Sequence, residues 1–199
     1  AIEVHTGESR LDQLGDYYFY TYNGVHYLVG YAGEDTDLVF PETYRGGDYV
    51  INQYAFYQAS VTSVVMFDCV TRIDNHAFSG CAELASIVMS NNVTTIGSYA
   101  FYYCNSLTSI VIPSSVMEVG AGAFSSCDSL VFNKFDSSYY LGNDSNPYHV
   151  LMSYGNFKES YVIHEDTVVI ASYAFASMQG IATVTIPDSI KAIGFNAFK

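Results

Sequence analysis

The stretch that decides the fold is LTSIVIPSSVMEVGAGAFSSCDS, which runs from Leu107 to Ser129. The 23 residues before it, LASIVMSNNVTTIGSYAFYYCNS from Leu84, repeat the same order of apolar, Gly, Ala-Phe and Cys positions. Along the chain the Ala-Phe pair recurs with spacings of 22, 23, 23, 51 and 23 residues. The six pairs are Ala55-Phe56, Ala77-Phe78, Ala100-Phe101, Ala123-Phe124, Ala174-Phe175 and Ala197-Phe198. Such a period is typical of a solenoid with one repeat per turn.

The apolar positions fit neither a sustained helical period nor a long alternation, so they favour one coil of chain per repeat. Because a single unit is too small to bury its own apolar face, it has to stack on its neighbours. Equivalent side chains then form columns, and the Phe position is expected in the core of every unit. In the short strand that opens each unit, side chains alternate between core and solvent. We therefore expect Ser86, Val88, Ser109 and Val111 on a presented face.

The order L-x-x-I-x-I-P, V-x-x-I-G and A-F-x-x-C resembles the leucine-rich repeats of the BspA-like surface proteins, over nearly all of residues 35–199. The resemblance implies a β-rich, right-handed leucine-rich-repeat solenoid of about six turns, with short strands in a parallel sheet and extended or 3₁₀ segments on the A-F-x-x-C side. It also implies adhesion to host extracellular proteins or to other cells, and an extracellular or cell-surface location. The departures from the pattern are Ala59 and Met178 for Cys, Asp74 and Ala171 for Gly, and Lys158 at an apolar position.

Two β-hairpins are expected to interrupt the repeats. The spacing of 51 leaves 28 residues beyond one 23-residue turn, between about Asn133 and Ser160, with strand-like segments around a polar loop. Near the start of the chain, Asn23-Gly24 between two tyrosine-rich segments is a strong hairpin signal. His26 and Leu28 lie 123 residues before His149 and Leu151, so hairpin and following turn recur as a block.

One structural domain with four segments is expected. These are an N-terminal segment with a hairpin (1–34), repeats (35–132), a hairpin insertion (133–160) and further repeats (161–199). The last repeat stops directly after its Ala-Phe pair at Lys199. Since solenoids need capping elements, we expect the chain to be a piece of a longer protein.

Composition limits the partners. The chain has 199 residues and a net charge of −13, so it repels phosphate backbones, and nucleic acid is not expected as a partner. No apolar run approaches the roughly 18 residues of a membrane span, so membrane insertion of this segment is not expected either.

The residues with reactive side chains follow the repeat. Cys81, Cys104 and Cys127 recur once per turn, which predicts a ladder of buried, reduced thiols, while the state of Cys69 is left open. Gly97, Gly120 and Gly194 recur likewise and are expected at positive φ. The equivalent places of His26 and His149 suggest a shared structural role, such as a hydrogen bond, and the loop that contains His164 suggests a role in a turn.

No motif in the sequence indicates an enzyme. G-x-S-x-G, H-E-x-x-H and the Gly-rich phosphate loops do not occur. The acidic stretch from Glu34 to Asp37 lacks the spacing of a calcium loop and is interpreted as a solvated loop. We therefore expect no catalytic residues, no cofactor and no metal.

The tyrosines carry the main functional indication. Tyr offers a large, rigid contact area with one polar end. Besides Ser86, Val88, Ser109 and Val111, the candidate ligand contacts are Tyr139, Tyr140, Tyr148 and Tyr154. The sequence thus predicts a non-catalytic binding or adhesion module that recognises a protein or glycan, with host extracellular matrix as one possibility. The alternative is an architectural spacer that presents another domain.

Overall fold

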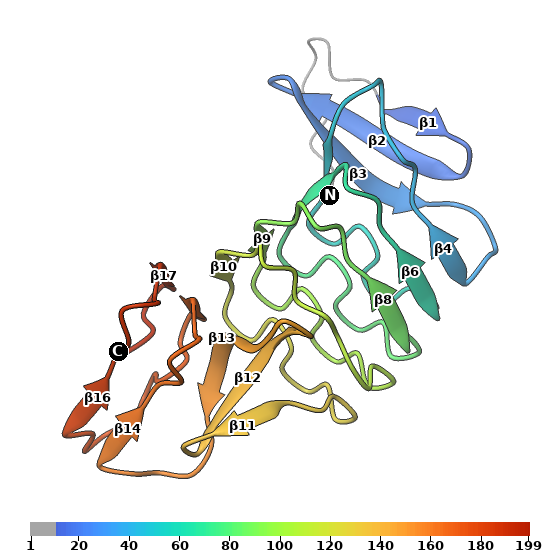
Figure 1. The fold of residues 1–199 in the computed structure, drawn as a ribbon. Coiled ribbons are helices and arrows are strands. Elements are labelled where there is room, and N and C mark those ends of the chain that lie inside the picture. Colours follow the sequence, from blue (N-terminus) through green and yellow to red (C-terminus); the bar gives the residue numbers. More distant parts are fainter. Residues whose placement is uncertain (1–10) are drawn as a thin grey trace.

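The computed structural model describes residues 11–199, and it contains no helix in this part of the chain. Regular structure consists of 17 short β-strands, and the chain winds through about seven turns of a β-solenoid. Figure 1 shows the turns following one another from the N-terminal sheet to the C-terminal end. Residues 1–10 of the expected N-terminal segment lie outside the described residues.

The strands predicted at the start of each repeat form one side of the solenoid. β4 (Asp37–Val39), β6 (Ser63–Val65) and β8 (Ser86–Val88) make a parallel sheet, and β14 (Ser160–Val162) pairs with β16 (Thr183–Thr185). The segment 109–111 was expected to continue the first sheet, but it is not a strand. The backbone next to this segment binds the insertion: the Ile112 N–H donates a hydrogen bond to the carbonyl of Gly142 at 2.7 Å.

A second set of parallel strands, which the sequence reasoning did not predict, lies on the V-x-x-I-G side and is divided between two sheets. β5 (Tyr49–Ile51), β7 (Val70–Ile73), β9 (Thr95–Ile96) and β10 (Glu118–Val119) belong to a seven-stranded sheet, whereas β15 (Val169–Ile170) and β17 (Ala192–Ile193), after the insertion, belong to a five-stranded sheet. Most of these strands have only two or three residues. The two apolar residues of V-x-x-I are therefore their only sequence signal.

Turns connect the two sides at the A-F-x-x-C segments, where extended or 3₁₀ segments were expected and the described chain has neither strands nor 3₁₀ helices. Left-handed residues such as Tyr99 (φ 55°) and Tyr103 (φ 63°) bend the backbone there. The prediction that the turn glycines need positive φ is wrong. A Cβ on Gly97 would lie 2.5 Å from Asn75 N, and one on Gly120 would lie 2.3 Å from Ser98 N. These positions need Gly because the backbone of the preceding turn approaches too closely for any side chain.

Both predicted hairpins are confirmed, and each carries one further antiparallel strand. The N-terminal meander comprises β1 (Asp12–Leu14), β2 (Tyr17–Tyr22) and β3 (Val25–Tyr31), and the insertion meander comprises β11 (Asn133–Phe135), β12 (Ser138–Asn143) and β13 (Asn146–Tyr154). The last strand of each meander pairs in parallel with the next strand on the V-x-x-I-G side, β3 with β5 in the seven-stranded sheet and β13 with β15 in the five-stranded sheet. Leu28 opposes Ile51 and Leu151 opposes Ile170, so the recurrence of the block is confirmed.

The core is a column of Phe rings, as predicted. Phe56, Phe78, Phe101 and Phe124 stack at successive centroid distances of 5.1, 5.3 and 5.2 Å. Phe175 begins a second stack, since within residues 11–199 no ring contact joins it to Phe124. All five of these side chains are buried, whereas Phe198 in the last turn is 42% exposed.

The insertion meander lies between two hydrophobic clusters. Leu141 and Val150 pack into the larger, N-terminal cluster. Tyr140 and Leu151, their neighbours in the strands, pack into the smaller, C-terminal cluster. Alternation along the two strands therefore gives the meander one face for each cluster.

The cysteines of the predicted ladder are buried and free. Each thiol donates a hydrogen bond to a Phe carbonyl one turn back: Cys81 to Phe56 at 3.0 Å, Cys104 to Phe78 at 3.3 Å and Cys127 to Phe101 at 3.0 Å. Burial raises the pKa of Cys81 to about 12. Cys69 is also buried and donates to the carbonyl of Pro41 at 3.3 Å.

Candidate functional site

The presented strand face is a shallow and almost uncharged strip. Ser86 and Ser109 are exposed, and Val88 and Val111 are 58% and 56% exposed. At one end, Asp37 accepts hydrogen bonds from the hydroxyls of Thr62 and Ser63, and these bonds lower the pKa of its carboxyl group. Strips of small side chains supply few of the aromatic and Arg contacts that dominate binding.

The tyrosines of the insertion have mostly structural roles. Tyr140 is 0% exposed, so its prediction as a ligand contact is wrong, because alternation along β12 turns its ring into the C-terminal cluster. Tyr139, Tyr148 and Tyr154 are half-buried. Tyr148 stacks on His164 at 3.8 Å, and Tyr154 stacks on Phe175 at 6.4 Å.

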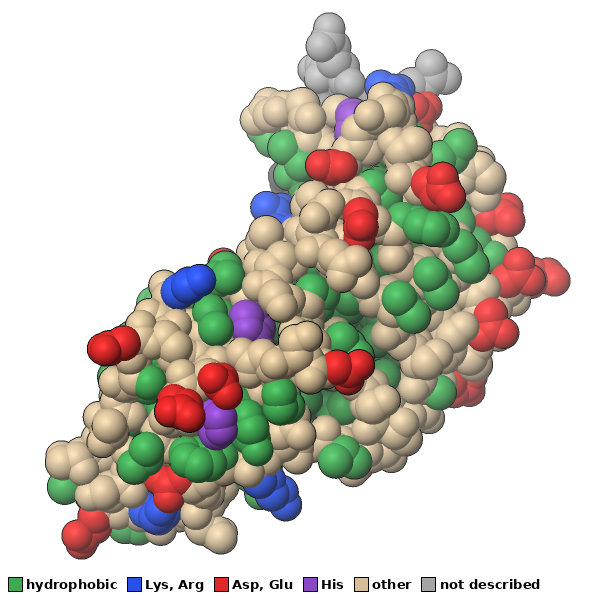
Figure 2. All heavy atoms as spheres, viewed as in Figure 1, with side chains coloured by type: hydrophobic (Ala, Val, Ile, Leu, Met, Phe, Trp, Pro, Cys, Tyr) green, Lys and Arg blue, Asp and Glu red, His purple; other side chains and the backbone are tan. Residues whose placement is uncertain are grey.

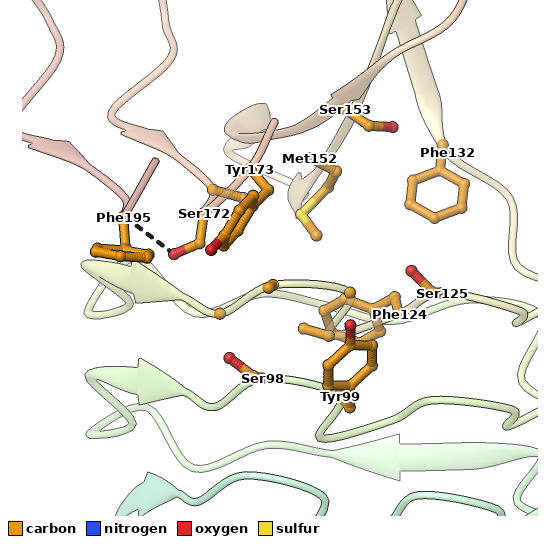
Figure 3. A pocket seen from close by; sticks show the side chains of 15 residues that line it. Ser98, Tyr99, Phe124, Ser125, Phe132, Met152, Ser153, Ser172, Tyr173 and Phe195 are labelled. Carbon is orange, nitrogen blue, oxygen red and sulfur yellow. Dashed lines mark hydrogen bonds between the residues drawn. The ribbon is translucent and has the colours of Figure 1, made fainter. Parts of the chain in front are cut away.

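A concave site lies where the insertion interrupts the Phe column. It is a groove of about 830 Å³, between the turn at residues 120–125 and the turn at residues 171–173. The insertion contributes three strands to the five-stranded sheet and no Ala-Phe turn, so the two stacks of turns stay apart on this side. Figure 3 shows Met152 and Ser153 of the insertion between them, with Phe132 alongside.

Aromatic rings and serine hydroxyls line this groove. Phe195 is 70% exposed, and its ring lies 5.8 Å from that of Tyr173. Tyr99 and Phe124 lie on the opposite wall in Figure 3. The polar side chains are those of Ser98, Ser125, Ser153 and Ser172 and the phenols of Tyr99 and Tyr173, and no charged side chain lines the groove. Ser172 Oγ accepts a hydrogen bond from the Phe195 N–H at 3.1 Å.

The sequence reasoning did not find this groove. Two signals were available: the doubled spacing between Ala123-Phe124 and Ala174-Phe175, and Phe195 at a position that holds Ser98, Ala121 and Ser172 in other turns. The first marks the gap between turns, and the second places a large apolar side chain where others are small.

The histidines do not form a common site. His26 Nδ1 lies 2.8 Å from the Thr21 hydroxyl, whereas His149 Nε2 lies 3.0 Å from the carbonyl of Val116. Both side chains form hydrogen bonds, as suggested, but their partners are a side chain in one case and a backbone carbonyl in the other. His164 lies in a turn, as expected, where its Nδ1 accepts a hydrogen bond from the Asp166 N–H at 3.2 Å.

Neither a candidate metal site nor a candidate membrane span occurs in the described chain. Within residues 11–199, no group of three or more His, Cys, Asp or Glu side chains could hold a metal ion. The same part of the chain has no helix of the length and apolarity that a membrane span requires. Figure 2 shows apolar side chains in small groups on the viewed face, with acidic side chains spread among them and few basic ones.

Comparison with known proteins agrees with the repeat pattern. A search of curated proteins found no match. A leucine-rich repeat protein from Bacteroides capillosus shares 30% identity, with a TM-score of 0.54 over 60% of this chain and 94% of its own. A leucine rich cell surface protein from Faecalibacterium prausnitzii shares 26% identity, with a TM-score of 0.60 over 98% of this chain. This chain spans about half of that protein, 47% of its length.

A more distant structure shows the same fold. The leucine rich repeat protein of T. pallidum shares 21% identity, with a TM-score of 0.60 over 93% of this chain and 86% of its own. The sequence profile of the BspA type leucine rich repeat region matches residues 49–145 and 151–199, in six copies. The chain therefore belongs to the BspA-type leucine-rich-repeat family.

Proposed function

We propose that the chain is a non-catalytic binding and adhesion module of a bacterial cell-surface or secreted protein, and that it recognises a host extracellular protein or a protein on another cell. Leucine-rich-repeat solenoids are typically scaffolds without catalytic activity, and their repeats generally mediate protein binding. A similar protein from Faecalibacterium prausnitzii is named as a cell surface protein, which supports a surface location.

The observation that carries this proposal is the uncharged aromatic groove at the insertion. Exposed rings such as Phe195 and Tyr173 cost free energy in water, and interface hot spots are enriched in aromatic side chains set in concave sites. The groove is neutral, whereas the whole chain carries −13. A partner segment with apolar side chains and flanking Lys or Arg would therefore fill the groove and be attracted by the surrounding charge.

Phe195→Ser tests this proposal, because Phe195 is the most exposed ring in the groove and its loss should leave the fold intact. The full chain is screened against purified extracellular matrix proteins and intact epithelial cells, and the affinity of each hit is measured by surface plasmon resonance. Phe195→Ser should weaken binding by about tenfold or more, which corresponds to ~1.4 kcal/mol. Tyr103→Ser is the matched control, since Tyr103 is 50% exposed and lies outside the groove.

Two results would contradict this proposal. An unchanged affinity in folded Phe195→Ser would place the contact elsewhere on the solenoid. A screen without any partner would favour the alternative, an architectural spacer that presents another domain. The observation in favour of a spacer is the row of small polar side chains, Ser63, Ser86, Ser109 and Thr183, along the presented strands.

A further inference from the structure

A second concave site lies at the other end of the described chain, on the outer face of the seven-stranded sheet. Its volume is about 440 Å³. Three side chains come from the N-terminal meander and three from the solenoid turns that follow. The lining residues are Tyr20, Tyr22, Tyr27, Asn52, Arg72 and Asp74.

Strand register brings these side chains together. Tyr20 opposes Tyr27 across the hairpin, Tyr27 opposes Val50, and Val50 opposes Arg72. Residues paired in this way point to the same face of a sheet. Tyr22 follows Tyr20 by two residues on that face, and the two rings are nearly parallel, at 11° with centroids 6.3 Å apart. The meander thus supplies an aromatic wall beside a polar group on the solenoid.

Two of the polar residues, Asn52 and Asp74, lie at a position of the repeat that is glycine in later turns. The N–H groups of Asn52, Asp74, Gly97 and Gly120 each donate to the strand residue one turn back, namely Leu28, Ile51, Ile73 and Ile96. These four residues therefore occupy one phase of the repeat. At Gly97 and Gly120 a Cβ would collide with the backbone, yet the first two turns carry Asn52 and Asp74. The repeat itself does not require polar side chains at this phase.

Arg72 and Asp74 hold each other in a fixed arrangement. Arg72 Nε donates to Asp74 Oδ1 at 2.6 Å, and an Nη donates to Oδ2 at 3.3 Å. The hydrogen bond that Arg72 donates to Asp74 raises the pKa of Arg72, and the Tyr27 side chain acts in the same direction. The pair is neutral overall, and both side chains remain partly exposed. Free N–H donors, carboxylate lone pairs and the Asn52 amide thus lie side by side.

The second block of the chain provides an internal comparison. In its meander the residues at the places of Tyr20 and Tyr27 are Leu141 and Val150, which oppose each other in the same way and continue to Val169. All three are buried in the N-terminal cluster. Where this face stacks on another turn of the solenoid, it is therefore aliphatic. Val50, the counterpart of Val169, is aliphatic too, but Tyr20, Tyr27 and Arg72, whose counterpart is Ala192, do not match that chemistry. This mismatch argues against a further turn as the occupant.

We propose that this site binds a neutral saccharide. The apolar face of a sugar ring fits the Tyr20 and Tyr22 rings, because aromatic faces pack against C–H groups while the phenol oxygens stay in water. Sugar hydroxyls both donate and accept, and Arg72, Asp74 and Asn52 offer both kinds of group with no net charge. The site is separate from the groove at the insertion and needs no metal.

The probes are short neutral oligosaccharides of glucose, galactose, mannose and N-acetylglucosamine, with sialylated and sulfated sugars as comparators. Saturation-transfer NMR detects binding to the full chain, and calorimetry measures affinity. We expect saturable binding of at least one neutral sugar. Tyr22→Ala and Asn52→Ala should each weaken it by about tenfold or more.

Control variants distinguish this site from the other exposed aromatic surfaces of the chain. Tyr103→Ala removes a tyrosine as exposed as Tyr22, at 50%, and should leave sugar binding unchanged, as should Phe195→Ser in the groove. Lack of binding to every neutral sugar, or an unchanged affinity in folded Tyr22→Ala, would overturn the proposal. Binding restricted to sialylated or sulfated sugars would also overturn it, because Arg72 would then act as a cation.

Discussion

Phe101 illustrates what one residue contributes to a stacked core. Its ring lies 5.3 Å from Phe78 and 5.2 Å from Phe124, almost parallel to both, and it is fully buried. Phe101→Ala should therefore lower the free energy of unfolding by about 3–5 kcal/mol, since neighbours fixed by the repeat cannot close the cavity.

Urea unfolding measures this change, and Phe195→Ala provides the comparison. Phe195 is an exposed Phe in a similar turn, so its loss should change stability by only about 0.5 kcal/mol. A cost below about 1 kcal/mol at Phe101 would show that the ring column is not the core.

For single residues, the sequence predicted which side chains form the core. It did not explain why particular residues are needed at other positions. The Phe and Cys columns follow from periodicity, because identical phases must share an environment. The role of Gly120 was misassigned, because the sequence cannot distinguish a residue that needs positive φ from one that another strand approaches closely. Tyr140 was misplaced because composition places tyrosines in a hairpin without showing which side each ring faces.

At the scale of elements, the turn between β11 and β12 is tied to the strand that resumes the solenoid. Asp136 forms an ion pair with Lys158 and accepts a hydrogen bond from the Val162 N–H at 2.6 Å. Lys158, which stands at an apolar position of the repeat pattern, therefore has an ionic partner in Asp136. The hydrogen bond from Lys158 lowers the pKa of Asp136, and the Val162 N–H adds to this effect.

Asp136→Asn should lower the free energy of unfolding by about 1–2 kcal/mol at pH 7, because it removes the charge from a partly exposed pair and weakens one backbone contact. A carboxyl group whose pKa is lower in the folded state stabilises the fold above its unfolded pKa of about 4, and this contribution is lost as the pH falls further. The difference between wild type and variant should thus shrink from pH 7 to pH 3 in urea unfolding. A difference independent of pH would show that the ionised carboxylate is not the stabilising group.

Long strands were easier to predict from the sequence than short ones. The tyrosine-rich hairpin strands and the strands at the start of each repeat were predicted from alternation and turn residues. β1 and β11 were not, since Asp12–Leu14 and Asn133–Phe135 carry no apolar alternation. The parallel strands on the V-x-x-I-G side were missed because they are formed by stacking, which a single turn of sequence does not show.

For the whole molecule, the insertion meander divides a continuous solenoid into unequal parts. The N-terminal cluster is the larger, and the C-terminal cluster is built around Phe175. Because stability in a solenoid is a sum of turns and interfaces, the weaker part can open without the rest.

Hydrogen exchange should therefore show faster exchange in β14, β16 and β17 than in β6, β7 and β9. Phe101→Ala should accelerate exchange in the N-terminal strands more than in the C-terminal strands. Uniform protection along the chain would mean that the two clusters open together, as expected of one cooperative domain.

The groove and the saccharide site share a reason for being hard to predict. Each depends on the gap or register between turns that are distant in sequence, and both lie where the repeat is broken. The departures themselves were visible: Asp74 for Gly, Phe195 for a small residue, and the doubled spacing before Ala174. In a repeat protein, positions that break the pattern mark candidate sites, and structure shows which of them come together.

The ring column also has an optical consequence. The chain has no Trp, so its near-ultraviolet spectrum comes from Phe and Tyr. Phe rings about 5 Å apart with planes within 5° of parallel hold their transition dipoles in a fixed, chiral array. Near-ultraviolet circular dichroism in the Phe bands should therefore follow the stacking of the turns directly, and it gives this chain an internal probe that needs no label.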